Sequence, residues 1–120
     1  MLSLKNLAVT SVATAPSPAT SGTTLVVTAG HGARFPDPAA DGSFPLVVWP
    51  VGAQPDPGNA EVALCTARSS DTLTITRAQE GSSARTVVIG DQVMLAVTAA
   101  VWAETRTNID IALFTAGVGR

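Results

Sequence analysis

The sequence predicts a mainly β protein, a small antiparallel β-sandwich or barrel. The chain has 120 residues, about the length of one small domain. Hydrophobic residues make up 46% of the chain, enough for a core, whereas charged residues make up only 13%. The apolar residues fall into short alternating or β-branched runs, separated by loops rich in Gly, Pro and Asp. Strands at such spacing are typical of small sandwiches and barrels.

Residues 1–22 are expected to form an extended N-terminal arm. Leu4 and Leu7 belong to a weakly alternating run that predicts a short edge strand, and the following APSPATSG predicts a tether. Pro16 and Pro18 cannot donate to a strand ladder and favour extended backbone. Because such an arm is suited to reach a neighbouring subunit, these four side chains are candidate interface residues.

The β-domain is expected over residues 23–98. Its strands alternate or are rich in β-branched residues, and Gly/Pro/Asp loops separate them. The runs EVALCTA and TLTIT, joined by a short connection, are expected to pair as a hairpin. Strands are predicted over residues 23–29, 44–50, 61–67, 72–76, 86–89 and 92–98.

Alternation within the hairpin predicts which side chains share a face. Val62, Leu64 and Thr66 are expected on one face of the first strand, and Leu73 and Ile75 are expected to point inward from the second.

The single cysteine and the two tryptophans are the other candidates for burial. Cys65 cannot form an internal disulfide, and its place in an apolar run favours a small buried hydrophobe over a nucleophile. Trp49 in VVWP is expected to anchor the core. Trp102 fits either the core or an interface, where tryptophan is a common anchor.

Residues 99–120 are expected to form a C-terminal interaction segment. A stripe of Val101, Thr105, Ile109 and Ala112 predicts a short helix. The alternative is an extended tail that adds a strand to a neighbour.

Charge and hydropathy exclude several classes of function. The chain has 7 basic and 9 acidic residues, a net charge of −2 and no basic stripe, which argues against nucleic-acid binding. No stretch reaches the roughly 18 unbroken apolar residues of a membrane span, and the N-terminus does not resemble a signal peptide. We expect synthesis and assembly in a cytoplasm. The low charge density suggests that partner subunits cover much of the surface.

Residues that could carry chemistry are scattered. His31, which lies between two glycines, is the only histidine of the chain, so a metal site with several histidine ligands is not possible. Asp37, Asp41 and Asp56 lie in Pro/Gly loops, where aspartate favours turns, and their spacing fits no EF-hand. No catalytic residue, metal or cofactor is predicted.

The segment RAQEGSSAR allows two interpretations, a working site or a strand connection. Arg77, Glu80 and Arg85 could pair within the loop or across a subunit boundary, and arginine suits geometrically specific interfaces. We interpret the segment as a connection whose Arg and Glu face a neighbour or solvent. Alanine at Arg77 or Arg85 is then expected to weaken assembly more than folding.

Residues 12–98 resemble a module of tailed-phage virion structural proteins. That module has a strand ending in an RFP turn, an NAE strand, a DTLTITRAQEG element and a GD turn before a final strand. These correspond here to Arg34–Pro36, Asn59–Glu61, Asp71–Arg85 and Gly90–Asp91. The DTLTITRAQEG element is the most specific of them.

The resemblance implies a phage structural protein without enzymatic activity. The module often stands at the head of tail-fibre or minor tail proteins, before a shaft and a tip, and this sequence contains neither. We therefore expect a capsid decoration or cement protein in the virion, assembled in the host cytoplasm, that forms a homo-oligomer, expected as a trimer, and binds the major capsid protein. The alternative is a tail-fibre, baseplate or minor tail adaptor protein. A separate enzyme or carbohydrate-binding module is disfavoured, since the chain has few aromatic residues.

Overall fold

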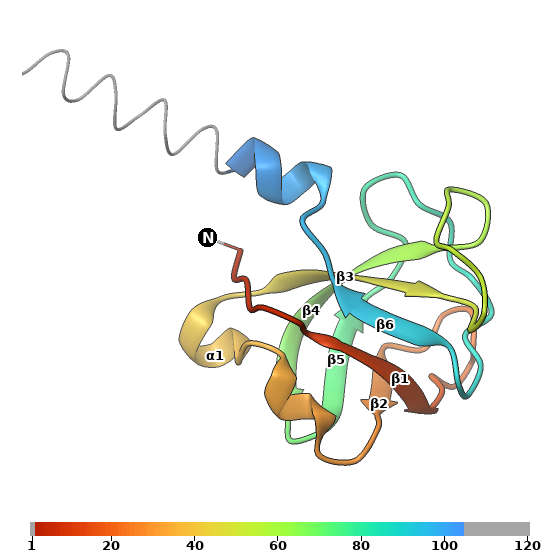
Figure 1. Ribbon diagram of the computed structural model, residues 1–120, viewed down its shortest axis with the longest axis horizontal. Helices are drawn as coiled ribbons and strands as arrows, with labels where there is room; N and C mark the ends of the chain where they lie inside the picture. Colours follow the sequence, from red (N-terminus) through yellow and green to blue (C-terminus); the bar gives the residue numbers. More distant parts are fainter. Residues whose placement is uncertain (1, 105–120) are drawn as a thin grey trace, which may run out of the picture.

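The computed structural model describes residues 2–104, in which six strands close an antiparallel barrel (Figure 1). The order around the barrel is β1-β2-β5-β4-β3-β6. The mainly β class is thus confirmed, in its barrel form. The strands are β1 (Val9–Thr14), β2 (Thr24–Val27), β3 (Phe44–Trp49), β4 (Glu61–Ser69), β5 (Thr72–Thr76) and β6 (Gln92–Leu95).

Strand β1 closes the barrel, because it pairs with β2 on one side and with β6 on the other. Val12 lies opposite Val27 of β2, and Val9 lies opposite Met94 of β6. The expectation of an edge strand in an extended arm is wrong for this segment. Burial explains the difference, since Val12 is part of the core and no strand of the barrel keeps a free edge.

The chain before β1 also lies on the barrel. We call residues 2–8 the strap. The backbone N–H of Ser3 donates to the Ser43 carbonyl oxygen (2.8 Å), and that of Leu95 donates to the Ala8 carbonyl oxygen (2.9 Å). The strap is therefore fastened near both of its ends to its own barrel.

Most predicted strands are present, and the difference lies before β6. The strand expected over residues 86–89 is absent, because Val87 enters the core from a loop while its neighbours Val88 and Ile89 are exposed. The backbone N–H of Val87 donates to the Ala19 carbonyl oxygen (3.3 Å). A single hydrogen bond of this kind satisfies a backbone polar group of the loop without pairing it to a neighbouring strand.

The hairpin of β4 and β5 forms as expected, and Val62, Leu64 and Thr66 share one face of β4, which is the outer face. Leu73 and Ile75 are buried, as predicted. Ala63 and Cys65 of β4 lie in the core, whereas Val62 and Leu64 are only half-buried.

The core consists of Ala8, Val12, Leu25, Val27, Phe35, Phe44, Leu46, Val48, Ala63, Cys65, Leu73, Ile75, Val87 and Val93.

Short helical turns cover one end of the barrel. The 3-10 turn η1 (His31–Arg34) leads to Phe35, whose ring stacks on Phe44 with centroids 5.6 Å apart. The single turn α1 (Pro38–Asp41) begins with Pro38, and the Asp37 side chain accepts from the Ala39 N–H at 3.1 Å. Proline in the first turn and aspartate at the N-cap are both favoured there.

The C-terminal segment begins as a helix over residues 99–104. Val101 is 3% exposed, so this helix buries one side chain against the rest of the chain. Thr105, Ile109 and Ala112 of the predicted stripe lie outside the described residues. Within the described part of the chain, no helix has the length and apolar character needed to cross a membrane.

The antiparallel strands place the connections at two opposite ends of the barrel. The strap end carries residues 2–8, η1 and α1, and the loop end carries residues 50–60 and 77–91. This division decides which surface residues can lie together.

Among the glycines of the described chain, Gly32 lies closest to another backbone segment, and we expect alanine there to destabilise the protein strongly. A Cβ at this position would overlap the carbonyl oxygen of Ser70 in the β4–β5 turn. Such overpacking against backbone is expected to cost about 3 kcal/mol or more. The matched control is Gly58→Ala, where the nearest atom is the Asp56 side chain at 3.3 Å. Urea unfolding of both variants tests the expectation, and equal losses would contradict it.

Candidate functional site

The loop 77–85 is organised around one buried carboxylate, Glu61. This side chain is 1% exposed. The Arg77 guanidinium donates from Nε to Oε2 and from Nη2 to Oε1, both at 2.8 Å. The backbone N–H groups of Ala78 (2.8 Å) and Arg85 (2.9 Å) complete the set. Four donors therefore surround the two oxygens, as a buried charge requires.

Arg85, which is partly exposed, forms a second ion pair, with the buried Asp91. Its Nη2 lies 2.7 Å from Oδ2 of Asp91, and its Nη1 donates to the Asn59 carbonyl oxygen at 2.9 Å. The Val88 N–H also donates to Asp91 Oδ2, at 3.0 Å. Asp91 is the residue directly before β6, so this pair fixes the path of the loop into the last strand.

The surroundings of Glu61 favour its ionised form. Burial raises the pKa of Glu61, but the hydrogen bonds from Arg77 and from the Arg85 and Ala78 N–H groups outweigh burial and bring the pKa below its usual value. The carboxylate is therefore charged at neutral pH and paired with a charged guanidinium.

The predicted orientation of the two arginines, toward a neighbour or solvent, is wrong. Besides binding Glu61, Arg77 donates to the carbonyl oxygens of Gly22 (2.9 Å) and Arg85 (2.8 Å), all within the chain. Alanine at Arg77 is accordingly expected to impair folding first. An additional interface role for either residue stays a prediction. Sequence reasoning missed Glu61, and its one signal was an acidic residue opening an apolar run.

Glu80 has a different part from the arginines. It is exposed, its backbone has a positive φ of 54°, and its Oε1 accepts from the Ala100 N–H at 2.9 Å. This bond satisfies a free N–H in the first turn of the helix 99–104. Glu80 thus ties the loop to the C-terminal segment.

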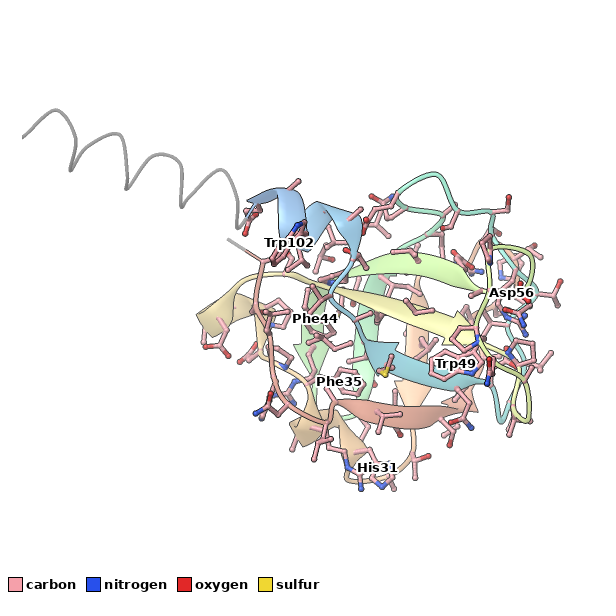
Figure 2. The ribbon with its side chains drawn as sticks, turned by 45° about the horizontal axis from the view of Figure 1, so that its top comes forward. His31, Phe35, Phe44, Trp49, Asp56 and Trp102 are labelled. Carbon is pink, nitrogen blue, oxygen red and sulfur yellow. The ribbon has the colours of Figure 1, made fainter. Side chains whose placement is uncertain are left out.

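Apolar side chains stand exposed at the strap end. Leu7 is 88% exposed, Leu4 53% and Trp102 60%. The Leu2 N–H bonds to Glu104 Oε1, so the strap and the helix 99–104 lie side by side, with Trp102 next to the strap in Figure 2. The core position considered for Trp102 is excluded, and the interface position stays a prediction.

The remaining predicted residues divide between inside and outside. Pro16 is buried, whereas Pro18 is exposed. Trp49 is half-buried on the outer face of β3, not in the core, because the inner face of that strand is taken by Phe44, Leu46 and Val48.

Polar residues that could carry chemistry are bonded within the fold. Thr10 Oγ1 and His31 Nδ1 are 2.7 Å apart, which joins β1 to η1. The Asp71 carboxylate accepts from the N–H groups of Gly30 (3.0 Å) and Gly32 (2.8 Å), and these bonds lower its pKa. Burial raises the pKa of the Cys65 thiol to about 11, so the thiol stays protonated at neutral pH. The described residues include no cluster of three or more metal-binding side chains.

The loop end carries a shallow cleft of about 410 Å³. Its size falls within the range of ordinary binding clefts. The cleft lies between residues 55–62 and residues 80–82, and we call it the loop-end groove. Its lining combines the apolar Pro55, Pro57, Ala60 and Val62 with the acidic Asp56 and Glu80.

No protein-family model matches the chain, and no curated protein matches it significantly.

We expect Glu61→Gln to destabilise the fold by about 3 kcal/mol. The substitution leaves the buried Arg77 guanidinium without its counter-charge, and breaking a buried pair from one side typically costs about 3–5 kcal/mol. Glu80→Gln is the matched control, because it changes an exposed carboxylate with one backbone bond, and it is expected to cost under about 1 kcal/mol. Urea unfolding at neutral pH measures both. A loss of similar size in the two variants would refute the central place of Glu61.

The lowered pKa of Glu61 also predicts how stability depends on pH. Because the folded-state pKa is below the usual value of 4.5, the stabilising contribution is complete above pH 4.5 and is lost as the pH falls through the folded-state pKa. Asp71 acts in the same direction. The urea midpoint should therefore fall on acidification below pH 4.5, and Glu61→Gln should show a smaller fall. Identical acid dependence in both proteins would contradict the assignment.

Proposed function

We propose that the chain is a non-enzymatic structural protein of a tailed-phage virion, and that it acts as a decoration protein of the head that self-associates on the capsid lattice. The observation that carries the proposal is the contrast between interior and surface. Glu61, Arg77 and Arg85 bind partners inside the chain, whereas the large apolar side chains of Leu7 and Trp102 are exposed. Leu4, Leu7 and Trp102 belong to the strap and to the helix bonded to it, and neighbouring exposed apolar side chains are typical of an interaction surface.

The closed barrel suits a protein that attaches by side-chain contacts. None of its six described strands offers a free edge for strand addition. The two ion pairs hold the loops in one arrangement before any partner binds. A preorganised surface loses less conformational entropy on docking, which favours binding to a repeating lattice.

The resemblance to phage structural proteins supports the class of protein. The residues of the shared motif also make contacts that stabilise the barrel. Asp71 orders the turn at Gly30, Leu73 and Ile75 fill the core, and Arg77 pairs with Glu61. These are folding functions. The motif therefore supports membership of the module, and the position in the virion has to be measured.

A tail-fibre, baseplate or minor tail adaptor protein is the second candidate. One observation favours it: the helix 99–104 runs from the barrel beside the strap, joined to it by the bond between Glu104 and Leu2 (Figure 1). A helix at the exposed apolar end is suited to connect the barrel to another tail component.

The copy number of the chain in separated heads and tails distinguishes the two candidates. Quantitative gel densitometry of purified virion fractions should find hundreds of copies with the heads if the protein decorates the capsid. A few copies with the tails would overturn decoration and support the adaptor. Absence from both fractions would overturn the virion assignment altogether.

A further inference from the structure

We propose that the strap of one copy inserts Leu4 and Leu7 into the loop-end groove of a second copy. The inference rests on the self-association in the proposed function for its biological setting. It goes further by naming the two surfaces and the mode of contact.

The strap presents leucine in an unusual way. Leu7 has a positive φ of 57° and is 88% exposed, the highest exposure among the large hydrophobic residues described. A left-handed backbone costs about 1–2 kcal/mol at a residue other than glycine. The turn is held by the Val9 N–H, which donates to the Leu7 carbonyl oxygen at 2.9 Å. The fold thus holds a strained turn that directs a large apolar side chain into water, as a binding surface requires.

The loop-end groove offers a matching site. Pro55, Pro57, Ala60 and Val62 give it apolar walls, and its volume of about 410 Å³ has room for apolar side chains. Two of these walls are prolines, whose restricted backbone reduces the entropy lost on binding.

Charge complementarity selects a second copy as the occupant. Lys5 lies within the strap, where its Nζ donates to the Ala33 carbonyl oxygen at 2.7 Å, and the adjacent Arg34 donates from Nη1 to the carbonyl oxygen of Val9, the first residue of β1, at 3.0 Å. Asp56 and Glu80 line the groove. None of the four takes part in an ion pair within the described residues. Docking would bring the two cations of one copy to the two carboxylates of the other, which favours one orientation.

The contact has to form between chains. The bonds of Ser3 to Ser43 and of Leu95 to Ala8 fasten both ends of the strap to its own barrel, whereas the groove is formed by residues 55–62 and 80–82 of other loops. One copy therefore uses its strap and the other its groove, which is a heterologous contact. Repetition of such a contact closes a ring, including the expected trimer, or extends as a filament.

Sedimentation velocity of the purified full chain across a wide range of concentration tests the contact. Leu7→Asp replaces the apolar side chain that the strap would insert, and Ala60→Arg places a large side chain in the groove. Each variant alone should self-associate at least about tenfold more weakly than the wild type. In a mixture of the two variants, the strap of the Ala60→Arg chain can still dock into the groove of the Leu7→Asp chain. The mixture should therefore form a 1:1 heterodimer and nothing larger. Asp56→Asn removes the charge but keeps the oxygen that accepts from the Gly58 N–H. This variant should associate more weakly than the wild type, and its association should depend less on salt concentration.

Ile89→Asp is the matched control, because Ile89 is 73% exposed and lies outside both surfaces. It should associate like the wild type, and thermal melting should show that all variants are folded. A wild-type chain that stays monomeric at every concentration overturns the proposal. So does a mixture that stays monomeric, or a control that weakens association as much as Leu7→Asp. These outcomes are separate from virion location, because a tail protein could use the same contact.

Discussion

The pairing of Glu61 with Arg77 is the constraint on which the rest of the barrel depends. A carboxylate at 1% exposure has to be matched by donors, and here all four donors come from the loop that follows β5. The loop therefore has one arrangement that satisfies the charge. That arrangement places Arg85 against Asp91, directly before β6, and β6 then pairs with β1 to close the barrel. A local electrostatic requirement thus contributes to a long-range strand pairing, beside the ladder that β6 forms with β3.

A buried ion pair is weak support for stability but can fix which structure forms, and the loop here illustrates the distinction. Replacing both partners by apolar residues is often neutral or stabilising in other proteins, because removing charges from water is costly. Without Glu61, however, the backbone N–H groups of Ala78 and Arg85 would also lose their acceptor. The network therefore orders a polar segment that has few apolar residues of its own, and Val87 is its one buried contact with the core cluster.

Sequence patterns predicted the local features of this fold and missed those that depend on distant partners. The hairpin and the inward Leu73 and Ile75 follow from alternation within a few residues. Alternation could not decide which face of β4 points inward, because Val62 and Leu64 are at least as apolar as Ala63 and Cys65. An inward Glu61 is favourable because the loop after β5 brings Arg77 and the N–H groups of Ala78 and Arg85 to its carboxylate. Similarly, nothing near Val9 reveals that its partner is Met94. Leu4 and Leu7 were singled out from their apolar pattern and are exposed, whereas the cleft at the loop end could not be predicted because it combines two loops far apart in sequence.

The residues behind the resemblance and the residues behind the proposed contact are largely different sets. In the segment Asp71–Arg85, the carboxylate of Asp71, the side chains of Leu73 and Ile75 and the guanidinium of Arg77 are all used inside the barrel. A sequence that keeps them can keep this barrel whatever it attaches to. In the proposed contact, attachment depends instead on the strap and on residues 55–62 of the groove. Proteins sharing the motif could therefore share a fold while differing in location, and the two ends are where such a difference would be encoded.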